Sequence, residues 1–172
     1  TPAVLSYDGI QYQYMAPAVM AEKELAYLKE HLRILSGFYG ILRPMDSVCP
    51  YRLEMQAKTQ KFGQLSLYDY WGDIISKQLC KKTSCILNLA SKEYSLAIEP
   101  YLPKKTLFIT CIFGDLQENK VIVKGTKVKM ARGEMVRFLA ENKIEDLKEI
   151  KKFERLGYHY EKERSDERTY VF

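Results

Sequence analysis

Two stretches in the second half of the chain decide the fold: residues 106–113, TLFITCIF, and residues 127–142, KVKMARGEMVRFLAEN. The first is rich in β-branched and aromatic residues, which favour a strand. In the second, Val128, Ala131 and Met135 recur at helical spacing and form one apolar face. A strong strand followed by an amphipathic helix predicts a domain that mixes both element types.

The flanking sequence extends this pattern in both directions. Leucines spaced three and four apart predict a helix over residues 18–35, and residues 67–79 predict a second one. Short strands are expected at residues 51–55, 84–89 and 120–124, the last of them after a turn at Glu118 and Asn119. The prediction is a single α/β domain over residues 1–172, with α+β as the alternative, in which helices flank a mixed sheet. Because the chain opens on Thr1 rather than Met, we also expect it to be truncated at the N-terminus.

The composition excludes several classes of protein. With 172 residues, 47% hydrophobic and 28% charged, the chain can bury a core of its own. Its four cysteines form no C-x-x-C pair, so we expect neither disulfides nor a zinc site, and no other metal or cofactor. No apolar run approaches the ~20 residues of a membrane span, and a cytoplasmic location is expected. The net charge of +5 permits an anionic partner but does not require one.

Three groups of residues carry more information than core packing requires. The first is LRILSGFYGILRP at residues 32–44, continued by PYRLEM at residues 50–55; the second is YWGDII at residues 70–75 with NLAS at residues 88–91; the third is KMARG at residues 129–133. Together they resemble the bacterial YaaA family, which responds to peroxide stress. The resemblance runs in order along nearly the whole chain.

The resemblance implies a mixed α/β fold with a positively charged cleft, and chains of about 250 residues, so this chain would correspond to the C-terminal two-thirds. Members of the family look like double-stranded DNA binders with a helix-hairpin-helix-like element. They are linked to limiting free iron and to oxidative DNA damage, and no catalytic reaction is implied.

The residues themselves offer a surface for DNA. Phosphates are bound by Lys and Arg irrespective of sequence. The candidates are Arg43, Lys124, Lys127, Lys129, Arg132 and Arg137. Gly37 and Gly40 would form the hairpin of a helix-hairpin-helix element, although their spacing departs from the usual one and a helix C-cap at Gly37 is the alternative. Gly133 costs its helix about 1 kcal/mol, so either a ligand or a neighbouring helix approaches it closely.

A pocket for a small anionic ligand or nucleotide is the second hypothesis, and it would make the protein an enzyme of unknown reaction. Its lining would come from Tyr51, Arg52, Glu54, Asn88, Ser91 and Tyr94, with Arg132 as a phosphate ligand. No nucleophile, base or phosphate-binding loop accompanies these residues, so a non-catalytic role ranks first. The thirteen tyrosines are also compatible with a homo-oligomer interface.

Overall fold

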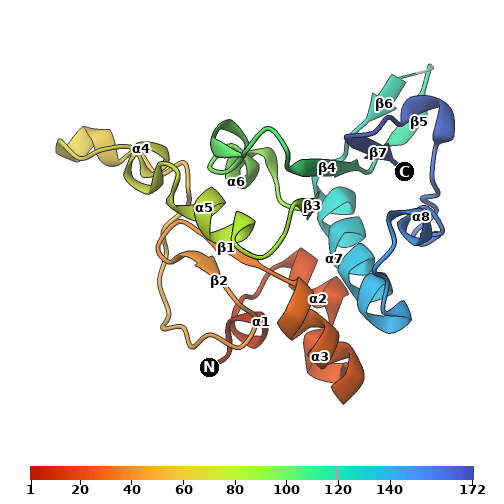
Figure 1. Cartoon of the computed structure of the whole chain (residues 1–172), viewed down its shortest axis with the longest axis horizontal. Helices are drawn as coiled ribbons and strands as arrows, with labels where there is room; N and C mark the ends of the chain where they lie inside the picture. Colours follow the sequence, from red (N-terminus) through yellow and green to blue (C-terminus); the bar gives the residue numbers. More distant parts are fainter. Residues whose placement is uncertain (119) are drawn as a thin grey trace.

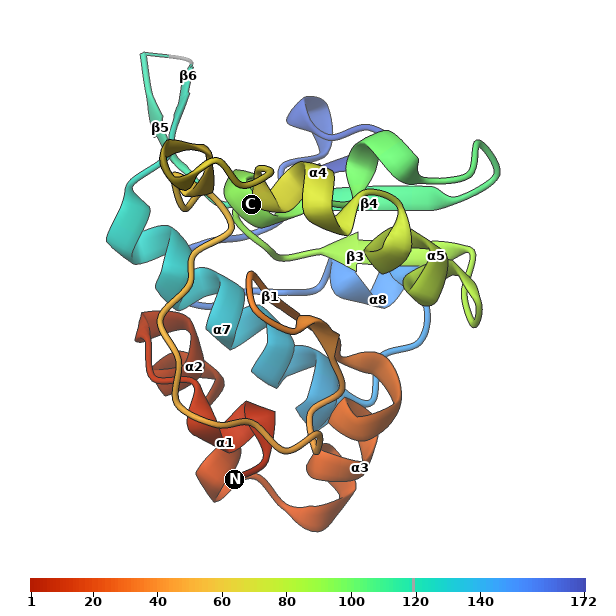
Figure 2. The same ribbon diagram turned by 90° about the vertical axis from the view of Figure 1, so that its left-hand side faces the viewer.

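The long helix α7 (Gly125–Asn142) lies at the centre of the molecule, between a sheet and the N-terminal helices (Figures 1 and 2). The structure is a computed structural model and describes residues 1–118 and 120–172. The helix predicted over residues 127–142 is confirmed, and it begins two residues earlier. Apolar residues lie on more than one side of α7, because the helix packs against both layers.

A three-stranded parallel sheet forms the layer on one side of α7. Its strands are β3 (Cys85–Asn88), β4 (Leu107–Ile112) and β7 (Thr169–Val171), in the order β3-β4-β7. The first two confirm the strands predicted at residues 84–89 and 106–113. Parallel neighbours need crossover connections. Between β3 and β4 these are α6 (Lys92–Ser95) and η3 (Glu99–Tyr101), and between β4 and β7 the chain passes through α7 and α8 (Leu147–Ile150).

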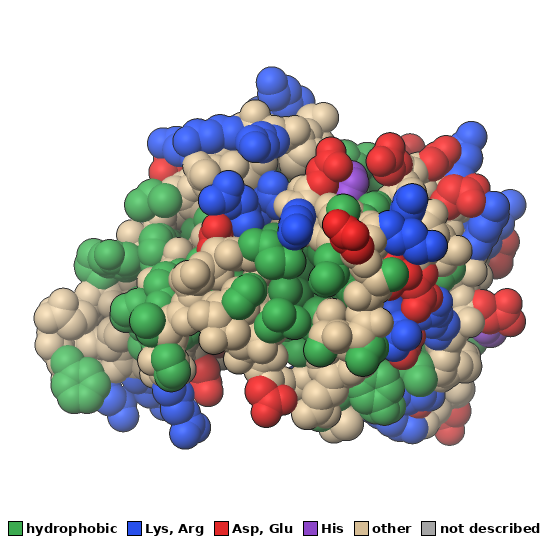
Figure 3. Space-filling view, turned by 90° about the horizontal axis from the view of Figure 1, so that it is seen from below, with side chains coloured by type: hydrophobic (Ala, Val, Ile, Leu, Met, Phe, Trp, Pro, Cys, Tyr) green, Lys and Arg blue, Asp and Glu red, His purple; other side chains and the backbone are tan. Residues whose placement is uncertain are grey.

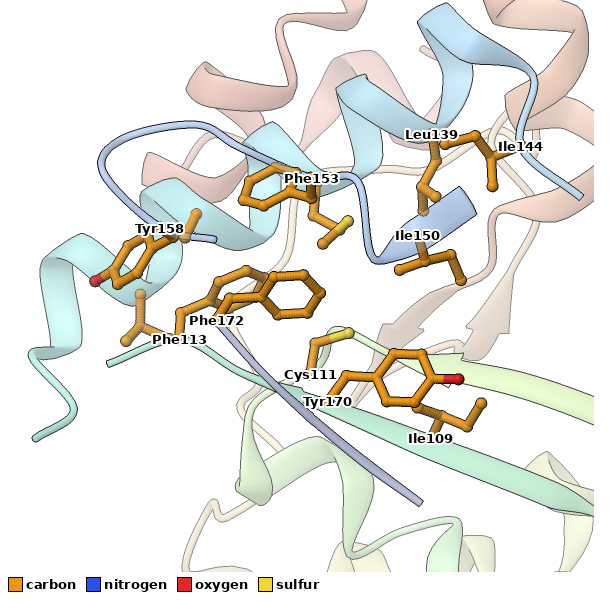
Figure 4. Close-up of a cluster of buried hydrophobic side chains, with 13 residues drawn as sticks. Ile109, Cys111, Phe113, Leu139, Ile144, Ile150, Phe153, Tyr158, Tyr170 and Phe172 are labelled. Atoms are coloured by element: carbon orange, nitrogen blue, oxygen red, sulfur yellow. The ribbon is translucent and has the colours of Figure 1, made fainter. Parts of the chain in front are cut away.

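The main core lies between this sheet and α7. Ile109 and Cys111 of β4 meet Leu139 of α7 there, with Phe153 and Phe172 from the C-terminal segment (Figure 4). Phe113 stacks on Phe172 and meets Phe153 edge-on. Each fully buried side chain of this size contributes roughly 1.5–3 kcal/mol. The segment after α7 is therefore fixed by its aromatic residues, although it holds little regular structure.

The N-terminal helices cover the opposite side of α7 (Figure 2). They are α1 (Ala3–Ser6), α2 (Ile10–Met15), η1 (Pro17–Val19) and α3 (Glu22–His31). Met15 and Leu28 pack against Val136 and Ala140 of α7. Because α7 contributes to the cores on both of its sides, the chain forms one α/β domain.

The remaining elements lie on the far face of the sheet, project from it, or, in the hairpin of residues 34–42, also pack against the N-terminal helices and α7. The helices α4 (Leu67–Trp71) and α5 (Ile74–Cys80) follow η2 (Thr59–Phe62), and Ile75 and Ile98 pack against Phe108 of β4. Two antiparallel hairpins are formed by β1 (Ile34–Ser36) with β2 (Gly40–Leu42), and by β5 (Asp115–Gln117) with β6 (Lys120–Ile122). The short η4 (Lys162–Arg164) precedes β7.

Three local predictions were wrong. The helix expected over residues 18–35 ends at His31, because Leu32 is extended and the next residues pair with β2. Residues 51–55 form no strand. The helix expected over residues 67–79 is divided at Gly72, which has a φ of +46°. The predicted turn at Glu118 and Asn119 involves Asn119, which lies outside the described residues.

Candidate nucleic-acid interface

The N-terminal half of α7 carries most of the side chains predicted to contact DNA. Lys124 precedes the first turn, Lys127 lies within it, and Lys129 and Arg132 follow on the next turns. The first turn contains no acidic residue, and no side chain caps it. A helix N-terminus carries partial positive charge, so added cations are unfavourable there unless an anion is close. This end of α7 is therefore strongly electropositive.

One carboxylate, that of Asp115 in β5, meets two of these cations. Its Oδ2 lies 2.9 Å from Lys124 Nζ, and its Oδ1 lies 2.6 Å from Lys127 Nζ. Hydrogen bonds from Lys127 and then Lys124 lower the pKa of Asp115, and the contact with Asp115 raises the pKa of Lys127. In the described part of the chain, no other carboxylate lies within ion-pair distance of the four cations, which leaves a local charge of 4 − 1 = +3.

Lys129 and Arg132 have no acidic partner among the described residues. Lys129 is exposed, whereas Arg132 is partly buried and its Nε is enclosed without a hydrogen-bond acceptor. Burial lowers the pKa of Arg132, and burial also raises the pKa of the neighbouring Cys111 thiol to about 12. An enclosed N–H group without an acceptor is costly. Arg132 is therefore the described cation whose surroundings most clearly lack an anion.

Arg137 does not belong to this group of unbalanced cations. It lies in the C-terminal half of α7, where its Nε is 2.7 Å from Glu141 Oε1. Glu141 also lies 2.5 Å from Arg155, which lies 2.9 Å from Glu134. These four side chains form a local network that links α7 to the loop after α8. The prediction that Arg137 adds free positive charge to the interface is therefore not supported by its contacts.

Arg43 is also paired, at some distance from α7 in the sequence. Its guanidinium lies 3.1 Å from Asp46 Oδ1, and the backbone amide of Arg43 donates to the same carboxylate. This amide hydrogen bond is the main cause that lowers the pKa of Asp46. The pair stabilises the turn after β2, and Arg43 need not meet a phosphate to be neutralised.

Gly37 and Gly40 lie in a β-hairpin and not between two helices. The hairpin joins two strands, β1 and β2, where a helix-hairpin-helix element would have two helices, so that interpretation is wrong. The alternative is wrong as well, because Gly37 caps no helix. A Cβ on Gly37 would lie 2.7 Å from the carbonyl oxygen of Leu53, and one on Gly40 would lie 2.8 Å from the Trp71 ring. Trp71 Nε1 donates to the Gly37 carbonyl oxygen at 3.0 Å. Both glycines therefore serve packing inside the molecule.

Gly133 is explained by a neighbouring helix. A Cβ there would lie 2.1 Å from the carbonyl oxygen of Gln11 and 2.9 Å from the amide nitrogen of Met15, both in α2. Of the two interpretations left open by the sequence, the close approach of a helix is the one that the structure supports. Gly133 therefore contributes to the interface indirectly, by holding α7 against the N-terminal helices.

Tyr51, the first residue of the alternative pocket, belongs to a chain of hydroxyl groups. Ser36 Oγ accepts from the backbone amides of Phe38 and Tyr39 at 3.1 and 2.9 Å. With both acceptor positions used, Ser36 donates to Tyr51 at 2.5 Å, and the hydroxyl groups of Tyr51 and Tyr7 share a hydrogen bond of 2.6 Å. The pKa of Tyr7 is raised, chiefly by burial. This chain fixes the hairpin against α1.

The other residues of that pocket make contacts of different kinds. Tyr94 lies near Tyr51 and Glu54, and burial followed by the charge of Glu93 raises its pKa. Asn88 is instead used within the sheet, where it donates to Thr110 at 3.2 Å and accepts from the amide of Ala90 at 3.0 Å. Ser91 and Arg52 are the remaining members. The side chain of Ser91 makes no cap hydrogen bond to α6, and Arg52 is exposed.

The sequence patterns did not indicate several residues that contact the candidate interface or the alternative pocket. Asp115 was passed over because its lysine partners lie nine and twelve positions away. Tyr7 and Ser36 meet Tyr51 only through the folded hairpin. By contrast, the i,i+4 spacing of Arg137 and Glu141 was a readable sign of pairing. No three His, Cys, Asp or Glu side chains within residues 1–118 and 120–172 are grouped as a metal site, and no described helix is long and apolar enough to cross a membrane.

The face seen in Figure 3 is not uniformly basic. Hydrophobic side chains gather across its middle, and Lys and Arg mingle with Asp and Glu on its right-hand side. The candidate interface considered below is the N-terminal half of α7, with Lys124, Lys127, Lys129 and Arg132.

Comparison with known proteins gives a consistent result. The model of the family described as "Peroxide stress protein YaaA" matches residues 1–164. A UPF0246 protein from Desulfitobacterium hafniense is 56% identical over 172 residues, which are all of this chain and 68% of that protein. UPF0246 proteins from Lachnoclostridium phytofermentans and Pediococcus pentosaceus are 55% and 51% identical, again over all of this chain and 68% of theirs. The chain therefore spans about two-thirds of the length of these relatives.

Proposed function

Since the chain belongs to the peroxide stress protein YaaA family, with a role in the peroxide stress response, we propose that it acts there by binding double-stranded DNA without catalysis. The observation that carries this proposal is the unbalanced charge of +3 on the N-terminal half of α7. A phosphate backbone supplies the anions that this end of the helix lacks.

The residue types favour binding that is independent of sequence. Lysine ammonium groups act as mobile point charges toward phosphate, and Arg132 adds a planar guanidinium that suits bidentate contact. Such contacts position a protein on the duplex and carry no sequence information. Lys124 and Lys127 are three residues apart, and so are Lys129 and Arg132, so the members of each pair can contact neighbouring phosphates together.

The test compares two double variants by fluorescence anisotropy with labelled duplexes of equal length and different sequence. Lys129→Gln with Arg132→Gln should weaken binding about tenfold or more, equally for all duplexes, because two phosphate contacts are lost. The matched control, Lys77→Gln with Lys152→Gln, removes the same net charge from two exposed lysines that pair with Asp73 and Glu149. An equal loss of duplex affinity in both double variants would show that only the net charge of the protein matters, and the proposed interface would be wrong.

A second candidate function is binding of a small anion, favoured by the enclosed Nε of Arg132. A nucleotide phosphate could supply the missing acceptor. Titration with a nucleoside monophosphate, followed by calorimetry, separates the two proposals. Saturable binding that Arg132→Gln abolishes, together with no binding of duplexes, would favour the small ligand over DNA.

A further inference from the structure

The first turn of α7 has backbone donors without acceptors. The amides of Gly125, Thr126 and Lys127 have no hydrogen-bond acceptor among the described residues, and the first regular bond of the helix is from Val128 to the Lys124 carbonyl. A Cβ added to Gly125 would meet nothing within 4 Å. The end of this 18-residue helix therefore offers free donors next to open space.

A second, independent feature at the same place is the hydroxyl group of Tyr158. The residue is only 3% exposed, and its hydroxyl is enclosed without a hydrogen-bond partner. Lys127 Nζ lies 4.7 Å from the centre of its ring. Figure 4 shows the hydroxyl directed away from the core, on the side of the first turns of α7. Burial raises the pKa of Tyr158. The charges of Lys127 and Lys124 act to lower this pKa, and the charge of Asp115 acts to raise it.

The group that now balances this end of the helix is the carboxylate of Asp115. It is carried by the β5–β6 hairpin, which projects from the domain (Figure 1), and it reaches both Lys124 and Lys127. Its side chain is 25% exposed, so water can reach it. A carboxylate held by two ammonium groups occupies the position that an incoming oxyanion would take.

We propose that the N-terminus of α7 binds a single phosphate group, held by Lys124, Lys127, the first-turn amides and the Tyr158 hydroxyl, and that Asp115 is its internal competitor. Binding then requires Asp115 to give up its two lysines. The phosphate can belong to a free ion or to a polynucleotide backbone; its assignment to duplex DNA rests on the function proposed above.

The first test follows the backbone amide resonances of the whole chain by NMR during titration with inorganic phosphate at constant ionic strength. The amides of Gly125, Thr126 and Lys127 should shift saturably. Asp115→Asn should tighten phosphate binding about two- to fivefold, because a competing charge is removed from a partly exposed pair. The matched control, Asp73→Asn, removes the same charge from the exposed pair with Lys77 and should leave the affinity unchanged.

Tyr158→Phe tests the hydroxyl group. It should weaken phosphate binding about three- to tenfold, as expected for one lost hydrogen bond. Since the hydroxyl has no partner in the free protein, a purely structural role predicts no change in phosphate affinity. Unfolding by urea checks that the variant is as stable as the parent chain.

The outcomes separate this inference from the proposed function. If inorganic phosphate shifts the first-turn amides but no duplex binds, the phosphate site stands and the DNA proposal fails. If duplexes bind through Lys129 and Arg132 but Asp115→Asn binds phosphate no more tightly, the function stands and the internal competitor is wrong. Absence of any phosphate-dependent shift at the first turn overturns the site itself.

Discussion

At the scale of single residues, the most informative group is the network around Glu141. Arg137 and Arg155 both donate to its carboxylate, and its side chain is 30% exposed. Partial burial acts to raise the pKa of Glu141, but the hydrogen bonds from Arg155 and Arg137 outweigh it and the pKa is lowered. The ionised form is thus favoured by folding, and the network contributes to stability only while Glu141 is charged.

Glu141→Gln should reduce the free energy of unfolding at pH 7 by about 1–3 kcal/mol, since two arginines lose a charged acceptor. A lowered folded-state pKa gives stability that is complete above the unfolded value of about 4.3 and is lost as pH falls through the folded value. The difference in free energy of unfolding between the parent chain and the variant should therefore shrink below about pH 4.3. Urea unfolding at several pH values measures it.

The control for this prediction is Glu149→Gln, which breaks an exposed pair with Lys152 at 2.7 Å. It should cost less than about 1 kcal/mol at pH 7. A Glu141→Gln variant as stable as the parent chain would show that the network is only a surface feature. If the difference in free energy of unfolding stays constant down to acid pH, the charge of Glu141 is not the cause of the stabilisation.

At the scale of elements, the contact between α2 and α7 depends on Gly133. Gly133→Ala should destabilise the protein by about 1–3 kcal/mol, because the added methyl group would collide with the backbone of α2. On an isolated helix the same change would stabilise by about 1 kcal/mol. Gly125→Ala, on the same helix but in open space, is the matched control and should be neutral or stabilising. Thermal unfolding of both variants decides; a stabilised Gly133→Ala variant would contradict the contact.

The elements also show how far the sequence could lead. Residues 106–113 and 127–142 were predicted correctly because burial and helical periodicity are both local signals. The helix expected over residues 18–35 failed where the hairpin of β1 and β2 competes with it, and no local pattern records that pairing. The break at Gly72 is similar, since glycine within a helical pattern is usually tolerated.

The candidate site was predictable in part for the same reason. The positions of Lys124, Lys127, Lys129 and Arg132 on one helix end follow from spacing alone. Their neutralisation does not: Asp115 reaches Lys124 and Lys127 from a different element. For Arg137 and Arg43 the partners were local, four and three residues away, and their pairing could have been inferred.

At the scale of the whole molecule, the distribution of charge matters more than its sum. The net charge of +5 is modest, yet the N-terminal half of α7 alone keeps a local charge of +3. The sheet and the N-terminal helices hold α7 from both sides, so its cations are presented on a fixed axis (Figure 2). A rigid, locally cationic helix end is suited to a phosphate backbone.

The most direct test of DNA binding by α7 is to measure the affinity of the whole chain for a labelled duplex across a series of salt concentrations. The logarithm of the binding constant should fall linearly with the logarithm of the salt concentration, with a slope of about −0.9 per neutralised phosphate, which is about −2 to −4 for two to four cations of α7. A slope near zero, or no binding at low salt, would contradict the account.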